Sequence, residues 1–333
     1  MSGSKKFIFL FLIFLFSFLN GNAEDSIQDA ILYESAGQQK ELSGKILNLT
    51  GAEGLIVLQK GSQVPDYIPI SSIIEIRTSK CDAHKAGDRA FEEGEKNRTS
   101  ESFSKAVDYY REARKNGEKR PWMRAWITSL IVKSLKGAGR ETEAVQEFLI
   151  LCQIDPLSPY LDSIPLQWIV SRSMAPEKRI ELEQIVLPWI NSQQNPGGKP
   201  NPTAQLLAAS FLLESSNGPY RQIAADALEA LILAPSSNQG SSARKDLALL
   251  ATAQLWRLKM HRSLSENEIS FWKEMSFRLS PSLQAGPIFL TGKAFLKIGQ
   301  KEKAKELLLR IPILYPLEKD LSQEAMRLLP AEK

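Results

Sequence analysis

The sequence predicts a mainly α protein, in which a small antiparallel β domain precedes a right-handed solenoid of about six helical hairpins and a capping helix. Three observations predict this class. Residues 7–19 form an apolar run, residues 24–80 contain short β-branched and alternating stretches, and apolar residues recur every three or four positions from Asp82 onward. These changes divide the 333-residue chain into segments 1–23, 24–80 and 81–333.

Residues 1–23 have the layout of a secretory signal peptide. Lys5 and Lys6 supply positive charge, the apolar run follows, and Gly21-Asn22-Ala23 offers small residues to a peptidase. The run is shorter than the ~20 residues of a spanning helix. We therefore expect cleavage after Ala23 and an exported protein that is periplasmic, in the cell envelope or secreted. An uncleaved membrane anchor is the alternative.

Segment 24–80 is expected to be a small β domain. Strands are predicted at residues 45–49, 54–58 and 70–76, with a further one at 30–33, and glycines between them supply turns. The layout resembles Sm-like or SH3-like barrels, which bind RNA, bind peptides or serve a structural role. Basic and aromatic residues do not interleave here, so we expect a spacer or docking role and no nucleic acid.

Segment 81–333 has the apolar pattern of successive helical hairpins. We expect one continuous array, with a split into two short arrays at residues 191–201 as the alternative. Asp82 is a candidate N-cap for the first helix, and the Asn201-Pro202 and Ser265–Glu268 stretches are start signals for later helices. The expected helices or hairpins cover residues 84–97, 103–113, 121–156, 165–170 with 176–190, 204–213 with 220–233, 247–258, 265–279 and 286–316, followed by a capping helix at 317–329.

Two of these hairpins share one spacing, Gly-x4-Ala-x3-Φ-x2-Φ-x4-Pro, where Φ is apolar. It is formed by Gly139, Ala144, Phe148, Leu151 and Pro156, and again by Gly299, Ala304, Leu308, Ile311 and Pro316. The spacing resembles the tetratricopeptide repeat (TPR), a helix–turn–helix unit that stacks into a solenoid. The resemblance implies a binding surface, with the first helix of each hairpin lining a concave face.

Helical phase then gives a set of candidate partner-binding residues, all expected to point outward. They are Trp126, Ser129, Lys133, Lys136, Phe289, Lys293 and Lys297. Lysines on this face favour an acidic protein or peptide as the partner, with Trp126 as an apolar anchor. The alternative is that these lysines are simply solvated. Most tryptophans fit packing between helices, as does the apolar stripe of residues 253–258, in which Arg257 is expected to point outward.

The sequence offers no evidence for catalysis. Its two histidines, His84 and His261, are far apart and are expected at the surface or at helix ends, and acidic pairs such as Glu181 and Glu183 fit exposed helical faces. We expect no enzyme activity, no metal and no cofactor. Cys152 is expected to be a buried thiol, and its pairing with Cys81 is left open.

The leading functional hypothesis is therefore an exported, non-catalytic scaffold or adaptor that binds a partner protein through the solenoid. With 42 basic and 38 acidic residues, the chain has no general attraction to nucleic acid or to anionic membranes. Two alternatives remain open. One is an envelope structural or assembly factor that self-associates into a homo-oligomer, and the other is a hydrolase whose convergent carboxylates lie in a deep polar pocket.

Overall fold

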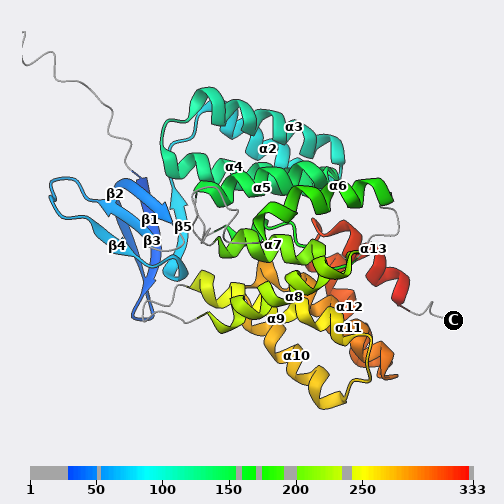
Figure 1. Ribbon diagram of the computed structural model, residues 1–333. Helices are drawn as coiled ribbons and strands as arrows, with labels where there is room; N and C mark the ends of the chain where they lie inside the picture. Colours follow the sequence, from blue (N-terminus) through cyan, green and yellow to red (C-terminus); the bar gives the residue numbers. More distant parts are fainter. Residues whose placement is uncertain are drawn as a thin grey trace, which may run out of the picture.

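The structure is a computed structural model that describes residues 29–50, 54–154, 160–169, 175–190, 201–234 and 242–329. It is mainly helical, with an antiparallel sheet at the N-terminal side of the described chain, as the sequence predicts. Figure 1 shows the sheet at one side of a stack of helices. The predicted signal segment 1–23 and the predicted Pro156 lie outside the described residues.

Within the described residues, the sheet has five strands in the order β4-β3-β2-β1-β5. They are β1 (Asp29–Ser35), β2 (Gln38–Thr50), β3 (Gly54–Leu58), β4 (Asp66–Ile68) and β5 (Ile73–Arg77). All neighbouring pairs are antiparallel. Ala36 and Gly37 join β1 to β2 with φ values of 54° and 74°, which are the left-handed conformations that a tight hairpin turn requires.

The sheet is open, because β4 and β5 lie at its two edges. The described strands therefore do not close into the barrel that the Sm-like or SH3-like resemblance implies. The expected strand at 70–76 is also shorter, since its first three residues form a 3-10 turn, η1 (Ile70–Ser72). One set of alternating side chains is buried, and it includes Ile31, Ile46 and Val57.

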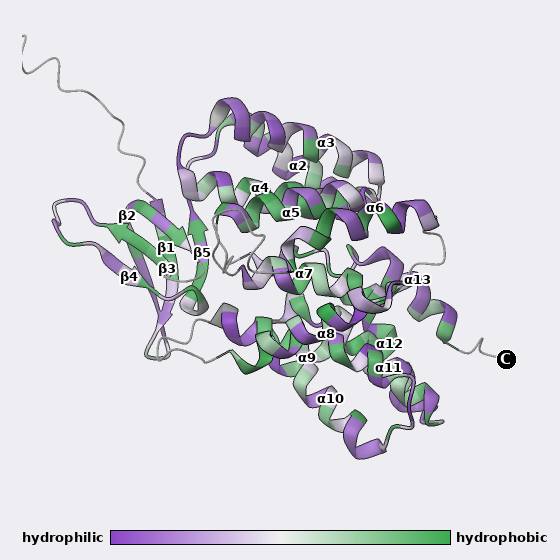
Figure 2. Cartoon of the chain, viewed as in Figure 1, coloured by the Kyte–Doolittle hydropathy of each residue, from purple (hydrophilic) through white to green (hydrophobic). Residues whose placement is uncertain are grey.

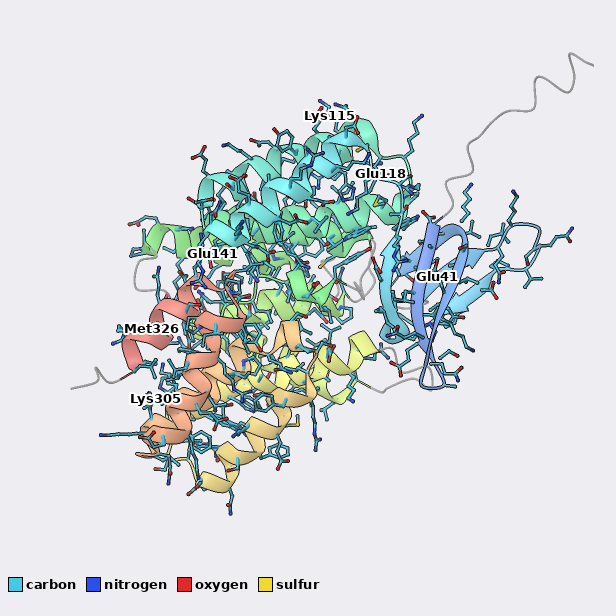
Figure 3. All side chains as sticks on the ribbon, turned by 180° about the vertical axis from the view of Figure 1, so that it is seen from behind. Glu41, Lys115, Glu118, Glu141, Lys305 and Met326 are labelled. Atoms are coloured by element: carbon cyan, nitrogen blue, oxygen red, sulfur yellow. The ribbon has the colours of Figure 1, made fainter. Side chains whose placement is uncertain are left out.

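A buried polar junction fixes the sheet to the helices. The Asp29 carboxylate accepts hydrogen bonds from the Ile46 amide (2.9 Å) and from the Thr78 hydroxyl. Arg120 directly precedes helix α4 (Pro121–Ala138). Its guanidinium donates to the Thr78 hydroxyl (2.7 Å), lies 3.5 Å from the Asp29 carboxylate, and pairs with Glu118 at 2.7 Å. Figure 3 shows Glu118 near the place where the helical part meets the sheet. The sheet and the helices are thus joined by buried charged groups that form ion pairs and hydrogen bonds with one another.

The helices follow in sequence order. They are α2 (Asp82–Asn97), α3 (Ser100–Glu112), α4 (Pro121–Ala138), α5 (Glu141–Ile154), α6 (Pro176–Val186), α7 (Pro202–Leu212), α8 (Gly218–Leu233), α9 (Ser242–Lys259), α10 (Glu266–Arg278), α11 (Ala285–Lys297), α12 (Lys301–Leu314) and α13 (Lys319–Leu328). None of the helices in the described ranges is long and apolar enough to cross a membrane.

Several helix ends have the chemistry expected from the sequence. The Asn201 side chain accepts from the Ala204 amide at the start of α7, and Ser265 accepts from Glu268 at the start of α10. Gly139 and Gly299 follow α4 and α11 with φ values of 76° and 81°, so both helices end at or near a left-handed glycine. Asp82 is instead the first residue of α2, after Cys81.

One predicted helix does not form. Residues 165–168 have no regular secondary structure, and only a 3-10 turn, η3 (Leu161–Ser163), precedes them. Leu161, Ile164 and Trp168 are nevertheless buried. We call residues 160–169 the threaded segment, because it runs in a non-helical conformation among the helices.

Consecutive helices pack closely where glycine faces an aromatic ring. A Cβ atom at Gly87 would lie 2.6 Å from the Tyr110 ring, and one at Gly137 would lie 2.7 Å from Phe103. These contacts bring α2, α3 and α4 together. Figure 2 shows α4 and α5 as mainly hydrophobic, whereas α2 and α3 are more hydrophilic. The core therefore runs through the middle of the stack.

Candidate functional site

The residues predicted from helical phase do not form one exposed patch. Ser129 and Phe289 are buried, with Ser129 donating to the Trp126 carbonyl at 2.7 Å. The expectation that these two point outward is wrong, because α4 and α11 are packed on more than one side. Trp126 is half-buried, edge-on to His84 and stacked with Trp122 at 6.3 Å.

The predicted lysines are mostly engaged within the chain. Lys133 pairs with Asp162 at 2.5 Å, and Lys136 pairs with Glu318 at 2.6 Å. Lys297 donates to the carbonyls of Met260 and Arg262, each at 2.6 Å, and Lys293 is half-buried. These contacts engage three of the four predicted lysines within the chain and weaken the argument for an acidic partner, which stays a prediction.

The C-terminal hairpin, which consists of α12, α13 and the residues between them, contacts the N-terminal helices. Besides the Lys136–Glu318 ion pair, the Lys319 ammonium donates to the Gly137 carbonyl, and Arg98 donates to the Pro312 carbonyl at 3.5 Å. We call this set the closure contact. It joins residues about 180 to 215 positions apart, so the stack of helices curves back on itself.

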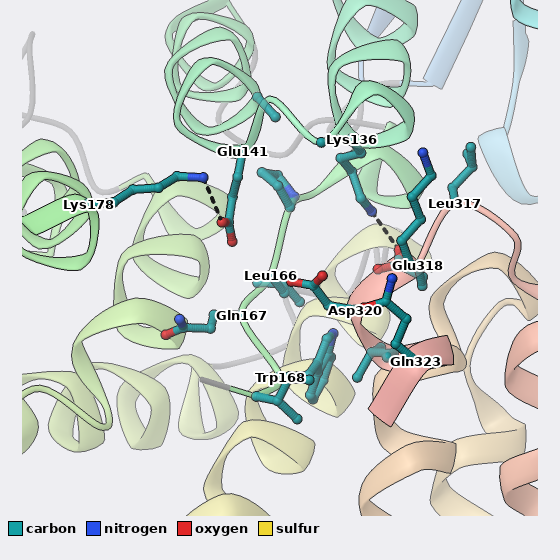
Figure 4. Close-up of a pocket in the computed structure, with 16 residues that line it drawn as sticks. Lys136, Glu141, Leu166, Gln167, Trp168, Lys178, Leu317, Glu318, Asp320 and Gln323 are labelled. Carbon is teal, nitrogen blue, oxygen red and sulfur yellow. Dashed lines mark hydrogen bonds and ion pairs between the residues drawn. The ribbon is translucent and has the colours of Figure 1, made fainter. Parts of the chain in front are cut away.

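A pocket lies beside the closure contact. Its volume is about 300 Å³, and its walls come from the end of α4 and start of α5, from the threaded segment, from α6, and from residues 317–323. Figure 4 shows Glu141 reaching into it from α5 and Asp320 from the start of α13. Lys136 is a predicted partner-binding residue that lines this pocket.

The floor of the pocket is apolar and rigidly supported. Leu166 and Trp168 of the threaded segment line it. The buried Arg257 of α9 donates to the carbonyls of Gln167 and Ser210, each at 2.7 Å, and pairs with Glu214 at 2.9 Å. Burial lowers the pKa of Arg257, and Glu214 opposes that shift. Arg257 therefore holds the threaded segment in place.

Charged groups surround the space above this floor. Lys178 of α6 lies 3.6 Å from Glu141. Burial raises the pKa of Glu141, the neighbouring Asp320 raises it further, and Lys178 offsets part of the shift. An apolar floor beneath a few convergent charges is the usual composition of a ligand site.

The described residues contain no group of three or more His, Cys, Asp or Glu side chains arranged to hold a metal. Cys81 is partly exposed and Cys152 is buried, and the two residues are not joined by a disulfide. Glu183, expected on an exposed face, is instead largely buried and accepts from Ser215 at 2.8 Å.

His84 also differs from its expected position at the surface. It is fully buried between the rings of Tyr110 and Trp126, with centroid distances of 5.8 Å and 5.7 Å. Burial lowers its pKa from 6.5 to about 4, although Asp88, whose carboxylate lies 3.6 Å away, opposes the shift. His84 is thus a neutral core residue at pH 7.

This burial predicts a loss of stability in acid. The unfolded chain binds a proton on His84 near pH 6.5 and the folded chain only near pH 4. Stability is therefore fully present above the unfolded pKa and falls as the pH drops through this window, by about 3 kcal/mol in total. Urea unfolding between pH 7.5 and 4 should show a smaller loss in the His84→Phe variant. Equal losses of stability in the variant and the parent would contradict the prediction. His261→Gln, at an exposed histidine, is the matched control and should lose as much stability as the parent.

Sequence reasoning missed most of the pocket. Glu141, Lys178 and Asp320 occupy ordinary helical positions, and no spacing relates them along the chain. They meet because the C-terminal hairpin returns to α4. The one local signal is Pro165 at the start of an apolar run, a pattern that predicts a helix.

Comparison of the chain with protein-family models, with curated proteins and with solved structures gave no match. The function must therefore be argued from the pocket itself.

Proposed function

We propose that the protein is an exported, non-catalytic adaptor with TPR-like helical hairpins, and that its pocket holds a short segment of a partner protein. The pocket is the observation that carries this proposal. It combines the Trp168 and Leu166 floor with charged side chains from α4, α5, α6 and α13. Its volume of about 300 Å³ is at the lower end of ligand sites and suits one or two side chains of a peptide.

The helical hairpins and the threaded segment support this role. Together they supply a fixed framework, since Arg257 anchors the floor and the closure contact anchors the wall at residues 317–323. Preformed sites lose less entropy when they bind. The sheet is joined firmly to α4 through Arg120 and Asp29, which supports a role as a spacer or a second contact.

The test is a bulky residue at the mouth of the pocket. Gln323 is exposed on α13 and lines the pocket. Gln323→Trp should block entry while leaving the core intact, so affinity capture with the full chain from its native envelope fraction should lose the partner. The binding of the purified partner should fall by about tenfold or more, which corresponds to ~1.4 kcal/mol.

Gln153→Trp is the matched control. Gln153 is an exposed glutamine on α5 outside the pocket lining, so the same substitution there should leave binding unchanged. If Gln323→Trp captures the partner as well as Gln153→Trp does, the pocket is not the binding site and the proposal is wrong.

Self-association is a second candidate, and one observation favours it. Ile313, Leu314 and Met326 are large exposed apolar residues at the C-terminal hairpin, and Figure 3 shows Met326 on this outer side. Apolar side chains of this kind can form an interface between copies. A concentration-dependent oligomer in sedimentation velocity that disappears in Ile313→Glu would support this alternative.

A hydrolase is the third candidate, because Glu141 and Asp320 supply two carboxylates to one pocket. The raised pKa of Glu141 is also what a general acid requires. The adaptor is preferred because Lys178 and the closure contact already pair most of the charges. Mass spectrometry of the partner after incubation distinguishes the two, since an adaptor releases it intact and a hydrolase releases it cleaved.

A further inference from the structure

The charges of the pocket are unevenly paired. Three lysines and three carboxylates line it within the described part of the chain. The closure contact uses Lys136 with Glu318 and directs Lys319 to the Gly137 carbonyl. The Lys319 ammonium also lies 5.7 Å from the centroid of the Phe103 ring. Among the described residues that line the pocket, only Lys178 therefore remains beside the two carboxylates of Glu141 and Asp320, which leaves one excess negative charge.

The position of Glu141 makes this excess costly. Glu141 is the first residue of α5, where the partial positive charge of a helix N-terminus would favour the carboxylate. Burial and the nearby Asp320 nevertheless raise its pKa, and Lys178 compensates only in part. A second cation placed between these carboxylates would relieve the cost.

An independent observation comes from Gln167 in the threaded segment. It lines the pocket with 5% of its surface exposed. Its side-chain nitrogen has no hydrogen-bond acceptor among the described residues. A buried amide donor is costly without an acceptor, and the main-chain carbonyl of a bound peptide is an acceptor of this kind. Trp168 next to it offers an aromatic ring, which attracts cations.

We propose that the pocket binds a basic side chain, lysine or arginine, of a peptide segment, with its cationic group between Glu141 and Asp320. The Gln167 amide donates to a carbonyl of the same peptide, and the stem of the basic side chain lies on Leu166 and Trp168. This proposal rests on the proposed adaptor function and names its partner as basic. It replaces the acidic partner expected from lysines that the structure pairs internally.

The test uses three pentapeptides of the form Ac-Ala-Ala-X-Ala-Ala-NH2, in which X is lysine, norleucine or glutamate. Isothermal titration calorimetry with the full chain at low salt should show binding of the lysine peptide at least about tenfold tighter than either of the others. Norleucine keeps the apolar stem and lacks the charge. It therefore separates recognition of the cation from burial of the stem.

Two variants locate the cation. Asp320→Asn and Glu141→Gln should each weaken binding of the lysine peptide by about tenfold. Asp226→Asn, at an exposed carboxylate of α8 that does not line the pocket, is the matched control and should not change the binding of the lysine peptide. Binding to the parent should strengthen as the pH rises through the raised pKa of Glu141, and this part of the pH profile should disappear in Glu141→Gln.

Equal binding of the lysine and norleucine peptides, no binding of the lysine peptide at millimolar concentration, or unchanged binding in Asp320→Asn would overturn the inference. These results leave the adaptor proposal standing if Gln323→Trp still abolishes capture of the partner. Conversely, capture that survives Gln323→Trp counts against the adaptor site whatever the peptides show. Circular dichroism of each variant confirms that it is folded.

Discussion

Replacing Arg257 with leucine is expected to lower the free energy of unfolding by about 3–5 kcal/mol, the range for removing one partner of a buried ion pair. Only 2% of the surface of Arg257 is exposed. Its guanidinium donates to the Gln167 and Ser210 carbonyls and to the Gln254 side chain, and it pairs with Glu214. Leucine fills much of the space and supplies none of these hydrogen bonds.

The cost comes from the groups left behind. The Gln167 carbonyl belongs to the threaded segment, which has no helical hydrogen-bond ladder of its own at residues 165–168. Without Arg257, this carbonyl retains the 3.3 Å hydrogen bond from Gln254, while the Ser210 carbonyl and Glu214 lose the guanidinium. Buried polar groups without partners cost more than the hydrogen bonds contribute when formed.

Urea unfolding followed by circular dichroism measures the change. Arg310→Leu is the matched control, because Arg310 forms an exposed pair with Glu306 one helical turn away, and such pairs contribute about 0–1 kcal/mol. Hydrogen exchange should also speed up at residues 164–168 in Arg257→Leu. Similar stabilities for the two leucine variants would show that Arg257 is not a structural anchor.

Arg257 also shows where sequence reasoning reaches its limit. Its place after the apolar stripe of α9 indicated an outward-pointing charge, yet the structure buries it against the threaded segment. An amphipathic pattern assigns one buried face to a helix. A helix in the middle of a stack is covered from several sides, and a buried arginine then depends on carbonyls supplied by distant segments.

Local signals were more informative about the elements. Apolar periodicity indicated most of the helices, and Asn201 and Ser265 cap helices as their side-chain chemistry predicts. The helix predicted at residues 165–170 does not form at residues 165–168, because apolar content fits a buried helix as well as a buried irregular segment. Only tertiary hydrogen bonds, such as those from Arg257, make the irregular form stable.

The candidate site could hardly be predicted at all. Helical phase selects Lys136 as an outward-pointing residue. Its ammonium instead pairs with the Glu318 carboxylate at 2.6 Å, because the C-terminal hairpin returns to α4. Glu141 and Asp320 become neighbours through the same return. Contacts between residues so far apart in sequence leave no periodic trace in it.

Gly286 is the second position at which a small change should have a large effect. It lies at the start of α11, directly against the indole ring of Trp168 in the floor of the pocket, and an added Cβ would overlap that ring. Helix propensity alone predicts that alanine stabilises a helix by about 0.5–1 kcal/mol relative to glycine. Overpacking a core costs about 1–3 kcal/mol. Because this cost is larger than the gain in helix propensity, Gly286→Ala should be destabilising.

Gly218→Ala is the matched control, because its Cβ would meet only the far end of the Arg221 side chain, at 3.7 Å. It should be neutral or slightly stabilising in the same urea titration, and equal behaviour of the two alanine variants would refute the steric argument.

A double-mutant cycle identifies the ring as the cause. Trp168→Leu alone should destabilise by removing buried aromatic surface. In that background, Gly286→Ala should cost much less than it does in the parent, since the overlapping ring is gone. The coupling would place α11 and the threaded segment in direct contact beneath the pocket. Because Trp168 also lines the pocket, the same variants should weaken binding of the lysine peptide even where the protein remains folded.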